Sequence, residues 1–229
     1  MRIDVVLATR LGTGPADDLR LERMRATGRP GVDIRIRIPD GAPTSITTPA
    51  EDARAAPGVI AEILAAEANG AEAVVVNCTA DTGVKRARAL AAIPVVGVSE
   101  SAFHLAAQLG GRFSVLTFAE RIAPRFRSMA RRWGMARRLA SVRSVEMPLE
   151  EIDDFAVLGT ALLAAAETCL REDGADLIVL GCTDFENAAG IVRDGLAERG
   201  YAVPVLCPFE LGMHQAASLL DMGLSRVRG

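Results

Sequence analysis

The amino-acid sequence predicts an α/β protein built from two pseudo-symmetric lobes, each a four-stranded parallel sheet flanked by helices. Short apolar segments alternate along the chain with helix-length segments rich in Ala and Leu. Such alternation, with strands that are continuous Val, Ile and Leu runs, is typical of parallel sheets covered by helices on both faces. The pattern of the first half also recurs in the second half, which predicts two lobes of the same topology.

Eight segments are expected to be strands. In the first lobe they are Ile3–Ala8, Val32–Ile38, Ala73–Cys78 and Pro94–Val98. In the second lobe they are Arg112–Phe118, Ser141–Met147, Leu177–Cys182 and Pro204–Pro208. Between the second and third strands, Pro57-Gly58 is expected to open a helix and Gly70 to close it.

The repeat is visible in three matched segments that occur in the same order. Gly70–Thr79 (GAEAVVVNCT) corresponds to Gly174–Thr183 (GADLIVLGCT), 104 residues later. The other matches are Ile93–Val96 with Val203–Leu206, and Glu100 and His104 with Glu210 and His214. We therefore expect lobe one to comprise residues 1–110 and 209–229, with a C-terminal helix that returns to it, and lobe two residues 111–208.

Composition excludes several classes of protein. The 229 residues have a formal net charge of −3, and half of them are hydrophobic, so nothing global recruits nucleic acid or anionic membrane. No apolar run approaches the roughly 18 residues that span a bilayer. The N-terminus leads directly into a strand and lacks the layout of a signal peptide. We expect a cytoplasmic homo-oligomer that acts on a small molecule, without nucleic-acid or membrane partners.

Two of the four cysteines are candidates for chemistry. Cys78 and Cys182 each end the third strand of a lobe and precede a threonine and an expected helix, whose N-terminus would favour a thiolate. In open parallel sheets, ligands bind beyond the carboxyl ends of the strands. The repeat would place both thiols across one cleft, where one removes a proton from a carbon and the other delivers a proton to the opposite face. The alternative is that both are small buried hydrophobic residues, as we expect for Cys169 and Cys207.

Other polar residues carry weaker signals. Asp81 and Asp184 lie shortly after the two cysteines, where each could cap the next helix or contact the thiol. Each Glu/His pair has i,i+4 spacing, which favours an intrahelical contact over a metal site. With two histidines and no C-x-x-C spacing, no metal is expected. Arg121 is the arginine placed to reach an anionic ligand, and Gly12-Thr13-Gly14 is too short to indicate a phosphate loop.

These motifs resemble the aspartate/glutamate/hydantoin racemase superfamily, and most of all its hydantoin and allantoin racemase branch. The resemblance rests on four stretches and on Ser45-Ile46, and it covers nearly the whole chain. The stretches are Gly70–Gly83, Pro94–His104, Arg112–Arg121 and Gly174–Thr183. The last contains Gly-Cys-Thr, which is closer to the aspartate and glutamate racemases. Ala8-Thr9-Arg10 departs from the branch's Asn-Pro-Asn-like stretch, and Asn77-Cys78-Thr79 departs from its first cysteine motif.

The resemblance implies a racemase or epimerase that needs neither pyridoxal phosphate nor metal, hence no cofactor. It implies that Cys78 and Cys182 are the acid–base pair, and that Thr79 and Thr183 donate hydrogen bonds to the substrate. The expected substrate-binding residues are those that follow the strands or lie in the Ser45 loop. They are Thr9, Arg10, Ser45, Asn77, Thr79, Thr117, Phe118, Arg121, Thr183 and Asp184.

The first expectation for the substrate is a 5-substituted hydantoin, whose ring hydrogen lies next to a carbonyl. An Asp/Glu-type amino-acid racemase and a maleate-isomerase-like cis–trans isomerase remain alternatives. The matched cysteines disfavour a decarboxylase of the arylmalonate type, which uses a single cysteine. A two-lobed, non-catalytic small-molecule binding protein is the alternative from a different class.

Overall fold

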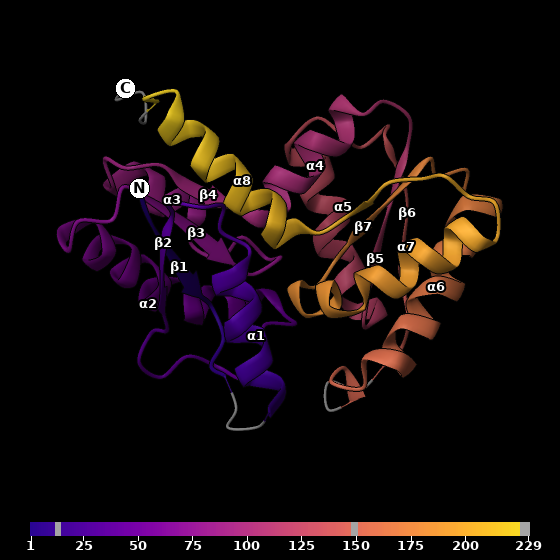
Figure 1. Ribbon diagram of the computed structural model, residues 1–229, viewed down its shortest axis with the longest axis horizontal. Helices are drawn as coiled ribbons and strands as arrows, with labels where there is room; N and C mark the ends of the chain where they lie inside the picture. Colours follow the sequence, from indigo (N-terminus) through magenta and orange to yellow (C-terminus); the bar gives the residue numbers. More distant parts are fainter. Residues whose placement is uncertain (12–14, 148–150, 225–229) are drawn as a thin grey trace. The chain divides into compact units, whose positions relative to one another are not determined.

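Eight parallel strands form two separate four-stranded sheets in the computed structural model, which describes residues 1–11, 15–147 and 151–224 (Figure 1). The first sheet has the order β2-β1-β3-β4 and the second β6-β5-β7-β8. Its strands are β1 Arg2–Leu7, β2 Asp33–Arg37, β3 Ala73–Asn77 and β4 Val95–Gly97. Those of the second sheet are β5 Phe113–Thr117, β6 Leu139–Ser144, β7 Leu177–Leu180 and β8 Val205–Leu206. The predicted fold class and the repeat of topology are confirmed.

Helices connect the strands, as parallel pairing requires. The α-helices of the first half are α1 Pro15–Ala26, α2 Pro49–Ala68, α3 Val84–Leu90 and α4 Val98–Gln108. Those of the second half are α5 Ala123–Arg132, α6 Phe155–Arg171, α7 Ala189–Glu198 and α8 Pro208–Asp221. Two short 3-10 helices are η1 Glu120–Ile122 and η3 Thr183–Ala188.

The chain divides into two compact units. The first comprises Met1–Ser101 and Phe209–Gly229, and the second Ala102–Pro208. The chain passes from the first unit to the second within α4, and it returns at the start of α8. The lobe ranges expected from the sequence stay a prediction.

The first sheet has an apolar layer on each face because successive strand residues point to opposite sides. On one face, Val6 and Val76 pack with side chains of α2 and α3. On the other, Ile3 and Val75 pack with α1 and with Phe209 and other residues of α8. Alternate strand residues thus bury both faces, and α8 covers this sheet although it ends the chain.

The second sheet is covered in the same manner. Phe113 of β5 contacts Phe103 of α4, with ring centroids 4.9 Å apart, and Phe103 in turn stacks with Phe126 of α5. On the opposite face α6 and α7 pack closely together. A Cβ added at Gly159 of α6 would lie 2.7 Å from Ile191 of α7, so this helix pair depends on the missing side chain.

The helix α2 begins earlier than the sequence predicted. Thr48 is its N-cap and Glu51 completes a capping box, with Pro49 in the first turn. Pro57 therefore lies inside the helix and does not open it. Gly70 does follow the end of the helix, with a φ of 84° that favours glycine.

The edge strands β2 and β6 each carry an arginine that is ion-paired within its own unit. Arg37 of β2 binds Asp4, which is fully buried, and lies 3.3 Å from Glu62. Arg143 of β6 occupies the corresponding register position and lies 2.6 Å from Asp173. Both arginines lie on edge strands, so a pinned charge follows each edge.

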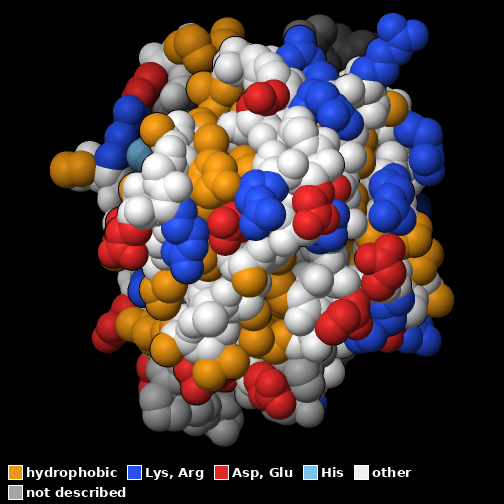
Figure 2. Space-filling view, turned by 90° about the vertical axis from the view of Figure 1, so that its right-hand side faces the viewer, with side chains coloured by type: hydrophobic (Ala, Val, Ile, Leu, Met, Phe, Trp, Pro, Cys, Tyr) orange, Lys and Arg blue, Asp and Glu red, His pale blue; other side chains and the backbone are white. Residues whose placement is uncertain are grey.

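The molecular surface is mixed in charge where Figure 2 shows it, with arginine side chains interspersed among aspartate and glutamate. Within residues 1–11, 15–147 and 151–224, no helix is both long and apolar enough to cross a membrane.

We predict that Gly181→Ala lowers the free energy of unfolding by about 2–3 kcal/mol, because the new Cβ would lie 2.4 Å from the carbonyl oxygen of Leu116. That oxygen belongs to the backbone of β5 and cannot rotate away. Gly190→Ala is the matched control, since a Cβ there meets nothing within 4 Å. It should leave the stability unchanged or raise it by up to about 1 kcal/mol. Urea denaturation measures both, and equal effects would contradict the steric argument.

Candidate active site

In the first unit, the end of β3 and the end of β1 lie side by side. Leu7 pairs in register with Asn77, the last residue of β3, and Cys78 follows at once. Thr9 comes shortly after β1, half-buried, and the next residue, Arg10, is exposed. Cys78 is itself half-buried and packs against the apolar layer that α2 covers. Parallel pairing thus brings Thr9, Asn77, Cys78 and Thr79 to one sheet edge.

The loop that holds Ser45 also belongs to this edge. The backbone N–H of Arg10 donates to the carbonyl of Pro43 at 2.9 Å. Ile46 is buried in the same apolar layer against which Cys78 packs. Ser45 lies between these two anchors and is half-buried. A cavity of about 250 Å³ opens beside the loop, lined in part by Ala8, Pro43 and Arg54.

In the second unit, β5 and β7 place the corresponding residues together. Leu116 pairs with Leu180, and the N–H of Gly181 donates to the carbonyl of Leu116 at 2.6 Å. Thr117 therefore ends β5, and Phe118 follows it, beside the segment that leads into Cys182; both are buried.

The two residues after Cys182 differ in what they contact. The Cys182 thiol lies 3.8 Å from a carboxylate oxygen of Asp184. Asp184 therefore adjoins the thiol, which was one of the two roles considered for it. Thr183 is half-buried and begins η3, with Cys182 as the N-cap.

The expected helix directly after Cys78 is absent, and this expectation was wrong. The chain turns at Cys78, with the N–H of Asp81 donating to the carbonyl of Cys78 at 2.8 Å. Asp81 and Gly83 have φ values of 50° and 73°, which no right-handed helix accommodates. The helix α3 begins only at Val84. Proximity to an α-helix N-terminus therefore does not apply to Cys78, and Cys182 precedes a 3-10 helix.

Asp81 caps a helix, but not the one that follows it. Its carboxylate oxygens accept the backbone N–H groups of Ser99 at 3.0 Å and Glu100 at 2.9 Å, in the first turn of α4. Its carboxyl group also lies over Gly97, where an added Cβ would approach within 2.6 Å. Burial raises the pKa of Asp81 to about 7, although the two N–H groups act in the opposite direction.

Arg121 has an acidic neighbour. It is exposed in η1 and helps to lower the pKa of Glu146, after the larger effects of the Ser144 hydroxyl and the Glu120 backbone N–H. The role of Arg121 as an anion contact stays a prediction.

Two predicted binding residues have buried polar atoms that lack a hydrogen-bond partner within the described part of the chain. They are the hydroxyl oxygen of Thr117 and the side-chain carbonyl oxygen of Asn77. Thr117 has no exposed surface. Buried polar atoms are nearly always paired in proteins, so these two strand ends have hydrogen-bonding capacity to offer a ligand.

Thr82 is a neighbour of Cys78 that the sequence reasoning missed. Its hydroxyl oxygen lies 3.7 Å from the Cys78 sulfur and 2.6 Å from a carboxylate oxygen of Asp52. Asp52 is in the first turn of α2, 30 residues away in the chain. The available signal in the sequence was the four-residue spacing between Cys78 and Thr82. This spacing brings two side chains together on a helix, but a turn follows Cys78 here.

The Glu/His pairs do not build a metal site. Glu100 lies 2.6 Å from Arg88, and the His104 ring centroid is 6.1 Å from that of Trp133. His104 and His214 are both exposed. Over the described ranges, no group of three or more His, Cys, Asp or Glu side chains suits a metal ion. Gly12-Thr13-Gly14 lies outside the described residues.

The remaining cysteines have structural surroundings. Cys169 is buried in α6, which raises its pKa, and the Ser141 hydroxyl lies 3.7 Å from its sulfur. Cys207 is buried, with a guanidinium nitrogen of Arg193 3.0 Å from its sulfur.

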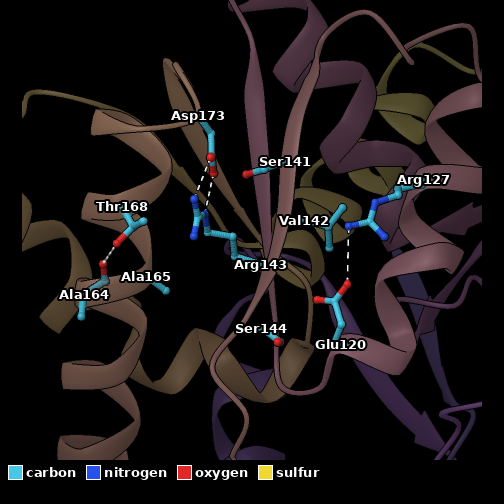
Figure 3. A pocket seen from close by; sticks show the side chains of 10 residues that line it. All are labelled: Glu120, Arg127, Ser141, Val142, Arg143, Ser144, Ala164, Ala165, Thr168 and Asp173. Carbon is cyan, nitrogen blue, oxygen red and sulfur yellow. Dashed lines mark hydrogen bonds and ion pairs between the residues drawn. The ribbon is translucent and has the colours of Figure 1, made fainter.

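A larger cavity, of about 570 Å³, follows the edge strand β6 (Figure 3). Its two arginines point to acidic partners: Arg143 reaches Asp173, and Arg127 lies 3.5 Å from Glu120. None of its lining residues is a cysteine or a predicted binding residue. Volume alone therefore does not identify the site, and the strand ends remain the candidate.

Comparison with known proteins shows the family of the chain. The family model described as Asp/Glu/Hydantoin racemase matches residues 21–216. The chain belongs to this family. The matched region includes both cysteine segments and both sheets except β1.

Relatives and solved structures narrow the comparison. The chain is 31% identical to a hydantoin racemase of Pseudomonas sp. (strain NS671), over 87% of this chain and 78% of the relative. It is 33% identical to a hydantoin racemase of Rhizobium meliloti, over 81% and 75%. Allantoin racemase from Klebsiella pneumoniae superposes with a TM-score of 0.87 at 28% identity, over 99% and 90%. The chain is therefore an enzyme, an isomerase of the racemase type.

We predict that the stability difference between the wild type and Asp81→Asn depends on pH. Between about pH 4 and about pH 7, a carboxyl with a pKa of about 7 in the folded protein keeps its proton. The same group in the unfolded chain has lost it. The wild type should therefore lose stability relative to the non-titrating variant as pH rises from about 4 to about 7, by about 2 kcal/mol or more. Urea denaturation of both proteins across this range measures it. If the free energies of unfolding of the two proteins changed in parallel with pH, the raised pKa of Asp81 would be contradicted.

Proposed function

We propose that the chain is a cofactor-independent racemase in which Cys78 and Cys182 act as acid and base on one carbon next to a carbonyl, with a 5-substituted hydantoin as substrate. One observation carries the proposal: the two cysteines follow the third strand of two sheets with the same topology. Both thiols are half-buried, and neither is in a disulfide. Membership of the racemase family supports a chemical role for these matched thiols.

The reaction needs two groups on opposite faces of the carbon. The thiolate of one cysteine takes the proton from C5, and the electron pair of the C–H bond moves to the adjacent carbonyl oxygen as an enolate. The thiol of the other cysteine then gives its proton to the opposite face, where the enolate electron pair forms the new C–H bond. The negative charge then lies on this second sulfur. Thr79 and Thr183 adjoin the cysteines and donate hydrogen bonds to the developing oxygen charge.

A hydantoin suits a weak base. Its ring spreads the charge of the enolate over a second carbonyl and nitrogen, whereas the carboxylate of a free amino acid opposes a second negative charge. No pyridoxal or metal is required for this step. The unpartnered oxygens of Thr117 and Asn77 can accept hydrogen bonds from ring N–H groups, and Thr9, Ser45 and Phe118 complete the binding set.

Turnover of matched substrates tests the substrate class. We expect racemisation of benzylhydantoin, isopropylhydantoin or allantoin, and none of aspartate or glutamate. Loss of optical rotation, with solvent-deuterium incorporation followed by mass spectrometry, measures it. Turnover of a free amino acid and of no hydantoin would reject the substrate and favour the Asp/Glu-type alternative, for which Arg10 would supply a cation. Cis–trans isomerisation of maleate would favour the isomerase alternative, and ligand binding without turnover a binding protein.

We predict that Cys78→Ser and Cys182→Ser each lower racemisation at least a hundredfold, on the order of the contribution of an acid–base group. One of them should still exchange the C5 proton of a single enantiomer, because each cysteine serves one face. Deuterium exchange measured separately on each pure enantiomer checks this. Cys169→Ser is the control, since that thiol is buried within α6. Full racemisation by either single variant would contradict the two-base mechanism.

Two further parts of the proposal concern the protein in solution. It acts as a homo-oligomer in the cytoplasm, which sedimentation analysis and cell fractionation test. Both thiols must also reach one substrate, so a short bifunctional thiol reagent should link Cys78 to Cys182 within one chain. Failure of the link, with both thiols reactive, would contradict a shared carbon.

A further inference from the structure

The two candidate catalytic thiols meet carboxylates in different ways. Cys182 lies directly beside Asp184, with 3.8 Å between sulfur and oxygen. Cys78 instead lies beside the hydroxyl of Thr82, and that hydroxyl is bound to Asp52. The residue that the 104-residue repeat matches to Thr82 is Glu186. The repeat therefore has no threonine at the matching position in the second unit.

The position of Thr82 is fixed from several sides. Its side chain is buried, with 1% of its surface exposed. On one side of it, Asp81 is tied to the first turn of α4. On the other, Gly83 packs on α2, where an added Cβ would lie 3.3 Å from the carbonyl oxygen of Ala56. The first turn of α2 presents Asp52 to the Thr82 hydroxyl.

Proton counting determines what the hydroxyl can do for the sulfur. A threonine hydroxyl has one proton, and its 2.6 Å distance to Asp52 is that of a hydroxyl donating to a carboxylate. With that proton directed to Asp52, the hydroxyl cannot also donate to Cys78, and its oxygen can accept the S–H of Cys78 across their 3.7 Å contact. A thiol with an ordinary pKa of about 8.5 is mostly protonated at neutral pH, so an S–H donor is available.

We propose that Thr82 is a positioning residue for Cys78: held by Asp52, its hydroxyl accepts the S–H hydrogen bond, fixes the thiol and keeps Cys78 as the proton donor of the resting enzyme. The catalytic meaning of this contact rests on the proposed function. The contact itself does not, because the state of the thiol can be measured without turnover.

Asp52→Asn gives the sharpest test. An amide can donate to the Thr82 oxygen, which frees the hydroxyl proton to stabilise a thiolate, and the negative charge is lost. Alkylation of Cys78 by iodoacetamide at neutral pH should become roughly three- to tenfold faster, as gain of a hydrogen bond to a charged group implies. Peptide mass spectrometry follows Cys78 and uses Cys182 as the internal reference, whose rate should not change.

The effect of Asp52→Asn on Cys78 alkylation should depend on the Thr82 hydroxyl. In a Thr82→Val background, which removes the hydroxyl at nearly the same volume, Asp52→Asn should have no further effect on Cys78 alkylation. In a Thr82→Ser background the acceleration should persist. A double-mutant cycle of the wild type, Asp52→Asn, Thr82→Val and the combined variant isolates the coupling between the two residues. An Asp52→Asn effect that is absent, reversed in sign, or equal with and without the hydroxyl would overturn the proposal.

Kinetics provide the second readout. Thr82→Val should lower kcat about tenfold, the loss expected for one hydrogen bond, with KM within about twofold. Thr82→Ser should restore kcat to within about threefold of the wild type. A Thr82→Val enzyme with unchanged kcat, or a Ser variant as impaired as the Val variant, would overturn the positioning role. If the wild type turns over no substrate, the proposed function fails, and the alkylation cycle still tests the contact.

Discussion

Parallel pairing of the central strands is the constraint on which both halves of the candidate site depend. In a parallel pair, neighbouring strands end at the same sheet edge. The register between β1 and β3 sets Leu7 beside Asn77, so Thr9 and Cys78 follow at the same edge. The register between β5 and β7 sets Leu116 beside Leu180, so Thr117 and the segment that leads into Cys182 lie at the same edge. The fit at that edge is close, because Gly181 approaches the backbone of β5. Helix packing on both faces then holds the strand ends in place.

The two units share a topology but differ in their polar chemistry. The buried Asp4 of β1 corresponds to Ser114 of β5, which hydrogen-bonds Ser141 at 2.7 Å. Gly97, under the Asp81 carboxyl, corresponds to the buried Cys207. A repeat therefore preserved the strands and cysteines, while the groups around each thiol diverged. For a racemase this matters because the two faces of a substrate carbon are not equivalent, and each thiol must donate and accept protons in its own surroundings.

The central strands β1, β3, β5 and β7 could be read from the sequence because they are almost entirely buried and mostly apolar. The family could likewise be recognised from the paired cysteine segments. The start of α2 was predicted wrongly, because a capping box at Thr48 and Glu51 determines it. A proline such as Pro57 is tolerated farther along the helix. The Thr82–Asp52 contact was not predicted either, because it joins a turn to a helix 30 residues away in the chain. Left-handed φ values at Asp81 and Gly83 delay α3, and no local pattern announces them.

The arginines on the outer strands have a consequence for the protein among its own copies. A bare, flat strand edge offers unpaired backbone groups to any passing strand, and this is a route to aggregation. Arg37 and Arg143 lie on the β2 and β6 edges and are held there by acidic residues of their own units. Adding a foreign strand would require moving charges that are already tethered. At the β2 and β6 edges, these tethered charges therefore oppose growth into continuous sheets that would extend without limit.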